Sequence, residues 1–207
     1  MAIFSAERLF RLAERIDRLV NGVGRRAAWL LVVLMAVILF DVVTRRFLVL
    51  GSTKLQELEW HLHGALFLLC LGYAYLQSAH VRIEVLRERM GRRTQAWVEL
   101  GGALILLLPY ALAIVAFGVV YAMRAHGWNE GSAAQTGLGQ RWIIKAAVPL
   151  GFSLLGLAGV SMALKAYAYL FGAPSLAARS GFEDVHMTLP HDEADPDDGA
   201  ARPEKDA

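Results

Sequence analysis

Long apolar blocks separated by short basic segments dominate this chain. A helix needs about 20 residues, each adding about 1.5 Å, to cross the roughly 30 Å hydrocarbon core of a bilayer. Four blocks come close to or exceed this length, at about 27–44, 60–77, 97–123 and 143–171. We therefore predict an all-α integral membrane protein with four transmembrane helices. Pro109 lies inside the third block and should kink that helix.

Lys and Arg residues are distributed unevenly among the segments that join these blocks. The two segments predicted to share one side contain Arg8, Arg11, Arg15, Arg18, Arg25 and Arg26, and then Arg82, Arg87, Arg89, Arg92 and Arg93. The other two segments contain only Arg45, Arg46, Lys54, Arg124, Arg141 and Lys145. Cytoplasmic loops of membrane proteins carry the excess of Lys and Arg. The pattern predicts that both termini are cytoplasmic.

The first 26 residues precede the first apolar block and show a helical period. Leu9, Leu12, Ile16, Leu19, Val20 and Val23 form one stripe, and arginines crowd the other side. We predict that residues 1–26 form an amphipathic helix in the cytoplasmic headgroup layer, in contact with membrane lipid. Docking on a partner protein is the alternative.

Two further segments are polar. Residues 173–207 contain 9 Asp or Glu against 3 Lys or Arg and few apolar residues, which predicts a disordered acidic tail. The segment from Arg124 to Arg141 is rich in glycine, which predicts a mobile external loop. The predicted organisation is therefore the helix at 1–26, a four-helix transmembrane domain at 27–172 and the tail.

Composition agrees with a membrane protein and excludes several other classes. Of the 207 residues, 56% are hydrophobic and 19% are charged, against about 45–50% and about 25% in soluble domains. This balance argues against a disordered protein, a nucleic-acid-binding domain and most soluble enzymes. A single cysteine, Cys70, excludes a disulfide framework and a cysteine-based zinc site.

Ionisable residues in the apolar blocks lie near their ends. Asp41, Glu59, Glu99, Lys145 and Lys165 all fall within about two turns of a predicted helix end. Transporters that bind their own cargo usually keep such groups near the bilayer midplane. We therefore expect no catalytic, substrate-binding or metal-binding residue and no enzyme activity. A self-sufficient small carrier is the less favoured alternative. Asp41 should pair with a residue one helical turn further on, Arg45.

The histidines leave one alternative function open. Anchor subunits of respiratory enzymes hold haem b between histidines of different helices. His61 or His63, at the start of the second block, and His126, at the end of the third, lie on the same external side. They could ligate such a haem, although interfacial hydrogen bonding is the simpler interpretation.

Four short motifs resemble a known family, over about residues 10–172. They are Arg46-Phe47, Glu57-Leu58-Glu59 ahead of Leu71-Gly72-Tyr73-Ala74, Ala79-His80-Val81-Arg82-Ile83-Glu84-Val85-Leu86, and Trp142-Ile143-Ile144-Lys145 followed by Pro149-Leu150-Gly151-Phe152. In this order they resemble the small permease (Q) subunit of tripartite ATP-independent periplasmic (TRAP) transporters. Glu84 stands where the family more often has Asp.

The resemblance implies a subunit without cofactor in a bacterial inner-membrane transporter. A periplasmic substrate-binding protein would deliver an organic acid to a large permease (M) subunit, which moves it with an ion, usually sodium. The small subunit would scaffold the permease and contact no substrate and no nucleic acid.

The resemblance also suggests interface or structural residues, namely Arg46, Glu57, Glu59, His80, Arg82, Glu84, Trp142 and Pro149. Arg46, Glu57 and Glu59 could pair with one another or face a partner. His80, Arg82 and Glu84 could form a subunit contact or a solvated loop near lipid phosphates. Trp142 and Pro149 would set the depth and entry of the fourth helix. Gly151, Gly156, Gly159 and Ala163 would permit close helix packing.

Overall fold

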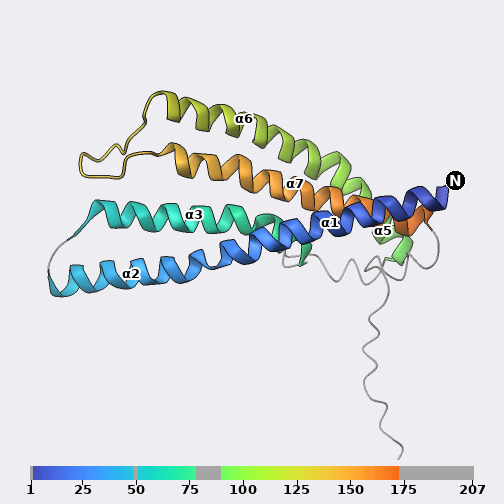
Figure 1. Ribbon diagram of the computed structural model, residues 1–207, viewed down its shortest axis with the longest axis horizontal. Helices are drawn as coiled ribbons and strands as arrows, with labels where there is room; N and C mark the ends of the chain where they lie inside the picture. The colour runs from blue at the N-terminus through green and yellow to red at the C-terminus, as the bar shows by residue number, and fades with distance from the viewer. Residues whose placement is uncertain (1, 49–50, 78–89, 173–207) are drawn as a thin grey trace, which may run out of the picture.

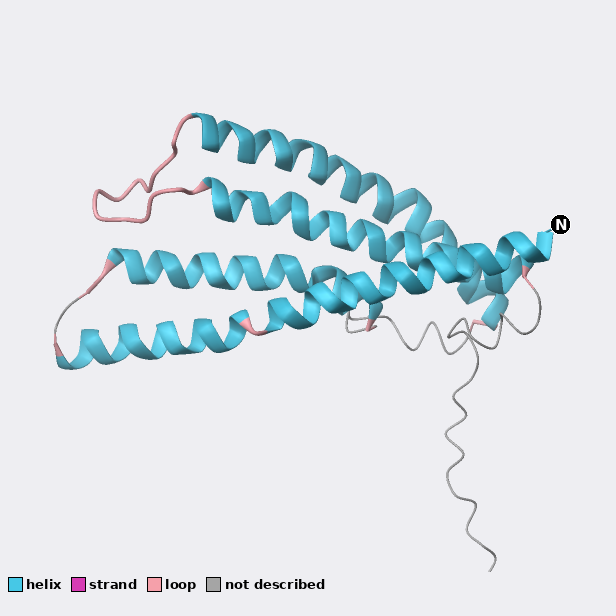
Figure 2. Cartoon of the chain, viewed as in Figure 1, coloured by secondary structure: helices cyan, strands magenta, loops and turns pink. Residues whose placement is uncertain are grey.

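Long helices lying side by side make up the described part of the chain. The computed structural model describes residues 2–48, 51–77 and 90–172. Within these ranges the secondary structure is helical, with connecting loops and no strands (Figures 1 and 2). The predicted acidic tail at 173–207 and the block from His80 to Glu84 lie outside the described residues.

The N-terminal helices α1 (Ala2–Ala28) and α2 (Leu30–Phe47) follow each other almost without a break. Only Trp29 separates them, where its N–H donates to the carbonyl oxygen of Arg26 at 3.2 Å and tightens the turn. The two helices together are about 69 Å long, more than twice the thickness of a bilayer core. The transition from arginine-rich α1 to apolar α2 falls at this turn.

Helix α3 (Thr53–Leu76) returns antiparallel to α2 (Figure 1). Ser52 caps its start by accepting a hydrogen bond from the N–H of Leu55 at 3.4 Å. The first half of α3 carries Lys54, Glu57 and Glu59, so only its second half is continuously apolar.

The third predicted block forms three consecutive helical pieces. They are α5 (Arg92–Gly101), the π-helix η1 (Gly102–Leu107) and α6 (Leu108–Gly127). Pro109 follows directly after the π-helix. A proline lacks its N–H and its ring clashes with the carbonyl four residues earlier, here Ile105, and the wider π-turn relieves both problems. The structure thus has a π-helix just before Pro109, where the sequence predicts a kink.

Helix α7 (Trp142–Phe171) is the centre of the bundle and contacts α1, α3, α5, η1 and α6, whereas α2 packs mainly against α3. Small residues allow these contacts to be close. A Cβ atom on Gly72 of α3 would lie 2.7 Å from the carbonyl oxygen of Leu154 in α7. Gly151 and Gly159 of α7 likewise approach Leu68 and Leu107, which confirms their predicted role in helix packing.

Three helical segments among the described residues are long and apolar enough to cross a membrane: Glu7–Phe47, Arg92–Gly127 and Trp142–Phe171. Helix α3 is not among them because of the polar residues in its first half. The chain is thus a membrane protein with at least three candidate spans, and the prediction of four crossings rests on α3.

The packed face of α1 overlaps the predicted apolar stripe only in part: of that stripe, Ile16, Val20 and Val23 pack in the bundle. Phe10, Ala13, Asp17, Val20, Gly24 and Ala27 point toward α7 and α3 at alternating spacings of three and four. Leu12 and Leu19, which belong to the predicted stripe, remain 46% and 52% exposed. On the packed face, small residues such as Ala13 and Gly24 permit close approach, Asp17 pairs with α7, and Phe10 and Val20 are buried beside them. The location of α1 in the headgroup layer stays a prediction.

Candidate functional site: polar clusters at the two ends of the bundle

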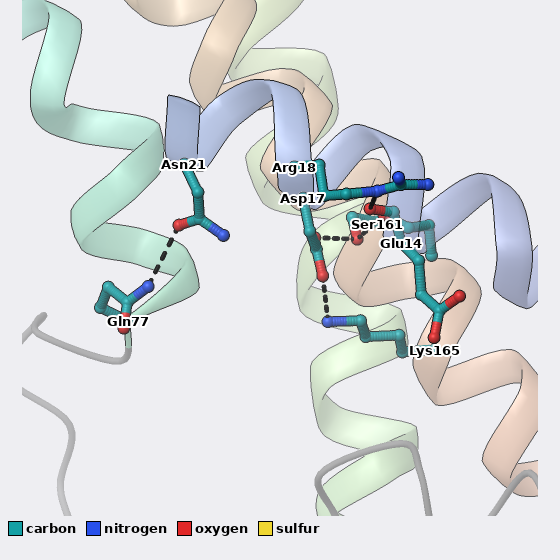
Figure 3. Close-up of polar contacts among 8 residues, drawn as sticks. Glu14, Asp17, Arg18, Asn21, Gln77, Ser161 and Lys165 are labelled. Atoms are coloured by element: carbon teal, nitrogen blue, oxygen red, sulfur yellow. Dashed lines mark hydrogen bonds and ion pairs between the residues drawn. The ribbon is translucent and has the colours of Figure 1, made fainter. Parts of the chain in front are cut away.

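A charged cluster joins α1 to α7 at the end of the bundle where the N-terminus lies (Figure 3). Lys165 Nζ donates to Asp17 Oδ2, forming an ion pair. Ser161 Oγ lies 2.5 Å from Asp17 Oδ1 and 3.2 Å from the carbonyl oxygen of Ala13. Ser161 is fully buried, and the side chains of Asp17 and Lys165 are 18% and 22% exposed. We call Asp17, Ser161 and Lys165 the Asp17 cluster.

One turn further along α1, a second polar contact reaches the end of α3. Gln77 Nε2 donates to Asn21 Oδ1 at 3.1 Å (Figure 3). Together with the Asp17 cluster, this bond connects the middle of α1 to two helices. Sequence reasoning missed all five of these residues as partners. The available signal was Lys165, a cation in an apolar block that requires a counter-ion.

At the opposite end of the bundle, Glu57 holds the loop between α6 and α7. Its carboxylate is almost buried and accepts hydrogen bonds from Ser132 Oγ and from the N–H of Leu138, the latter at 2.6 Å. These bonds, first that of Ser132, lower the pKa of Glu57 from its usual value because they favour the charged form. A Cβ atom on Gly137 would lie 2.8 Å from Glu57 Oε1, so the loop needs glycine there.

Two further contacts hold the same loop. Thr136 Oγ1 donates to Thr53 Oγ1 at 3.2 Å. Glu130 accepts from Lys145 Nζ at 2.5 Å, and this ammonium also lies 4.0 Å from the ring centroid of Tyr121. We call Glu57, Ser132 and Leu138 the Glu57 cluster. The loop predicted to be mobile is thus tied to α3 and α7 by hydrogen bonds.

The predicted external residues of α2 and α3 are placed as follows. Asp41 Oδ2 accepts from Arg45 at 2.6 Å, which confirms the expected pair one turn apart. Arg46 is exposed in the last turn of α2. Within the described ranges, Arg46, Glu57 and Glu59 form no ion pairs with one another, and Glu59 Oε1 is buried without a hydrogen-bond partner.

Trp142 and Pro149 lie in the first half of α7. The indole N–H of Trp142 donates to Gln140 Oε1 at 2.6 Å, and its ring packs edge-on against His126. Pro149 is buried beside α6, where a Cβ on Gly118 would lie 3.1 Å from its Cδ. Both residues therefore contact the α6 side of α7, which agrees with a structural role.

Taken together, these contacts join helices of one chain. No group of three or more His, Cys, Asp or Glu side chains suited to a metal ion occurs within residues 2–48, 51–77 and 90–172. His61 Nδ1 lies 2.5 Å from the carbonyl oxygen of Glu57, and His126 packs on Trp142.

Comparison with known protein families gives a match. The model of the DctQ component of tripartite ATP-independent periplasmic transporters matches residues 34–169, well over half of the chain. The chain belongs to the DctQ family. The resemblance noted in the sequence is thereby confirmed, and the protein is a small membrane subunit of a TRAP transporter. No match is found among curated proteins or among solved structures.

The DctQ match runs from Leu34 in α2 to Tyr169 in α7. It includes the whole Glu57 cluster, together with Ser161 and Lys165, whereas Asp17 and the rest of α1 precede it. DctQ is a transporter component family and not an enzyme family, and it gives no support to the alternative of a haem-b anchor.

Proposed function

We propose that this DctQ chain is a non-catalytic scaffold for the large permease of a TRAP transporter. The permease carries out ion-coupled uptake of an organic acid that a periplasmic binding protein delivers. The family match carries this proposal. The small subunit enlarges the fixed part of the complex in the bilayer and contacts no substrate.

Exposure of the apolar helices supports a scaffold role. In the most apolar windows of Glu7–Phe47 and Arg92–Gly127, only 17% of residues are buried, against 39% in Trp142–Phe171. Helices α2 and α6 therefore offer wide apolar surfaces, and α7 is the helix around which the chain packs. Such surfaces suit both lipid and the helices of a large membrane partner.

The positions of the ion pairs support the same view. Asp17–Lys165, Asp41–Arg45 and Glu130–Lys145 all connect groups of this chain. Charges that are paired within the subunit have their partners in its own helices and loop. Substrate and coupling ion are handled, in this proposal, by the permease.

The proposed topology has four crossings, with both termini in the cytoplasm of a bacterial cell and the chain in the inner membrane. Helix α3 provides the fourth crossing, and its position beside α2 and α7 supports this assignment. The excess of arginines in the segment before α2 and in the segment after α3 supports the orientation.

The test is uptake in proteoliposomes that contain the permease and its binding protein, with and without this chain. We expect uptake to require the chain, and the tagged chain to co-purify with the permease in mild detergent. The apparent affinity for substrate should follow the binding protein. Uptake at the full rate without the chain would contradict the proposal.

A further inference from the structure

The outer face of α1 carries a row of arginines that the bundle does not use. At about 100° per residue, this face lies opposite the one that packs on α7 and α3. It contains the exposed residues Arg8, Arg11, Leu12, Arg15, Arg18, Leu19, Arg25, Arg26 and Trp29. We call this set the arginine face. From Arg8 to Trp29 it extends over about 32 Å.

The arginine face keeps a strong positive charge in the folded chain. The carboxylate of Asp17 turns inward to Lys165 and Ser161 (Figure 3). Arg18 Nε donates to the backbone carbonyl oxygen of Glu14 at 3.4 Å, a bond that leaves the cation's charge in place. Six guanidinium groups therefore face outward with only Glu7 and Glu14 near them in sequence.

Large apolar side chains lie among these arginines. Leu12, Leu19 and Trp29 are 46%, 52% and 70% exposed. An acidic peptide would neutralise the arginines but leave these side chains in water. A membrane surface satisfies both kinds of residue, since phosphates bind guanidinium groups and the headgroup boundary takes up leucine and tryptophan.

We infer that the arginine face of α1 is a binding surface for the phosphate groups of anionic phospholipids. The face selects anionic over zwitterionic lipids because a zwitterionic headgroup brings no net charge. Trp29, at the end of this face, adjoins the apolar helix α2. The inference goes beyond the scaffold role and does not depend on it, since every residue of the face precedes the part of the chain that matches the DctQ family.

The rival occupant is the acidic segment at 173–207, with 9 Asp or Glu against 3 Lys or Arg. It follows α7, whose Ala168 packs against Phe10 of α1. The exposed leucines and tryptophan favour lipid over this segment as the occupant of the arginine face. The experiment below distinguishes these two occupants.

The experiment counts phosphatidylglycerol and phosphatidylcholine molecules bound to the full chain by native mass spectrometry in detergent. The test variant is the triple substitution R8Q/R11Q/R15Q, which leaves the packed face intact. The matched control is R46Q/R124Q/R141Q, which removes the same charge at the other end of the bundle. Helix content by circular dichroism confirms that each variant is folded.

We expect the wild type and the control to prefer phosphatidylglycerol. The triple variant should lose affinity by about five-fold per arginine, or about a hundred-fold in total. Equal retention of phosphatidylglycerol by both variants would overturn the inference. The inference would also be overturned if the wild type showed no preference for phosphatidylglycerol and acquired one when residues 173–207 were removed. The acidic segment would then be the occupant of the arginine face.

Discussion

The close crossing of α3 and α7 gives the most direct test of the fold. Gly72 has no side chain to separate the two helices, and a Cβ atom at this position would lie 2.7 Å from the carbonyl oxygen of Leu154 and 2.8 Å from its carbonyl carbon. An ordinary contact between carbon and carbonyl oxygen is about 3.3 Å or longer. In a Gly72→Ala variant the helices must therefore separate by roughly half an ångström or more, and a backbone atom cannot rotate out of the way.

Gly64 is the matched control because it lies on the same helix and also faces α7. The nearest atom to a Cβ on Gly64 is Ile144 Cδ1 at 3.4 Å, the end of a side chain that can move. Replacement of glycine by alanine in a helix gains about 1 kcal/mol in propensity at either position. Overpacking costs about 1–3 kcal/mol and applies only to Gly72→Ala. The difference in unfolding free energy between the variants should thus be about 1–3 kcal/mol, with Gly64→Ala the more stable.

The assay is unfolding of the full chain in mixed micelles with increasing dodecyl sulfate, followed by circular dichroism. Gly151→Ala provides a second test, since its Cβ would meet the backbone of Leu68 on α3. Both Gly72→Ala and Gly151→Ala should unfold at lower detergent fraction than Gly64→Ala. Equal unfolding curves for Gly72→Ala and Gly64→Ala would refute the close approach of the two backbones.

Two further predictions concern the polar clusters. Because the pKa of Glu57 is lowered in the folded state, its bonds should stabilise the loop at neutral pH and be lost as the pH falls below the usual carboxyl range. The protection factor of the Leu138 amide, which compares its hydrogen exchange with the intrinsic rate at the same pH, should fall in acid, and in Glu57→Gln already at neutral pH; unchanged protection in that variant would count against the cluster. Asp17→Asn leaves the Lys165 ammonium without its counter-ion and should cost about 1–3 kcal/mol. A double-mutant cycle with Lys165→Met measures the coupling, which should vanish if the pair is not formed.

The sequence predicts contacts that are local and misses those between distant segments. The Asp41–Arg45 pair follows from helical spacing alone, and the helices follow from the apolar blocks. The bond from Ser132 to Glu57 joins positions 75 residues apart, and that from Lys165 to Asp17 joins positions 148 apart. One sequence contains no signal for which segments meet, so these partners could not be assigned.

The packed face of α1 could not be fully identified from the sequence, for a different reason. Bulky residues such as Leu12 and Leu19 suggest the buried side in a soluble protein, where water drives them inward. In a membrane protein, small residues such as Ala13 and Gly24 mark the contact between helices, because lipid solvates large apolar side chains equally well. The two rules favour overlapping faces of the same helix. Ala13 and Gly24 are buried as the second rule predicts, and Val20, which belongs to the predicted apolar stripe, is buried with them.

The contact of α1 with α7 has a consequence for how the chain is made. Helix α1 is synthesised first, yet its partners Ser161 and Lys165 belong to the last described helix. At about 5–20 residues per second, the ribosome needs about 7–30 s to travel the 148 residues from Asp17 to Lys165. During that interval α3 is already available to the nascent α1, but Lys165 and the rest of its α7 partner are not. The order of synthesis therefore makes the docking of α1 on α7 a late event, after the preceding helices have been made.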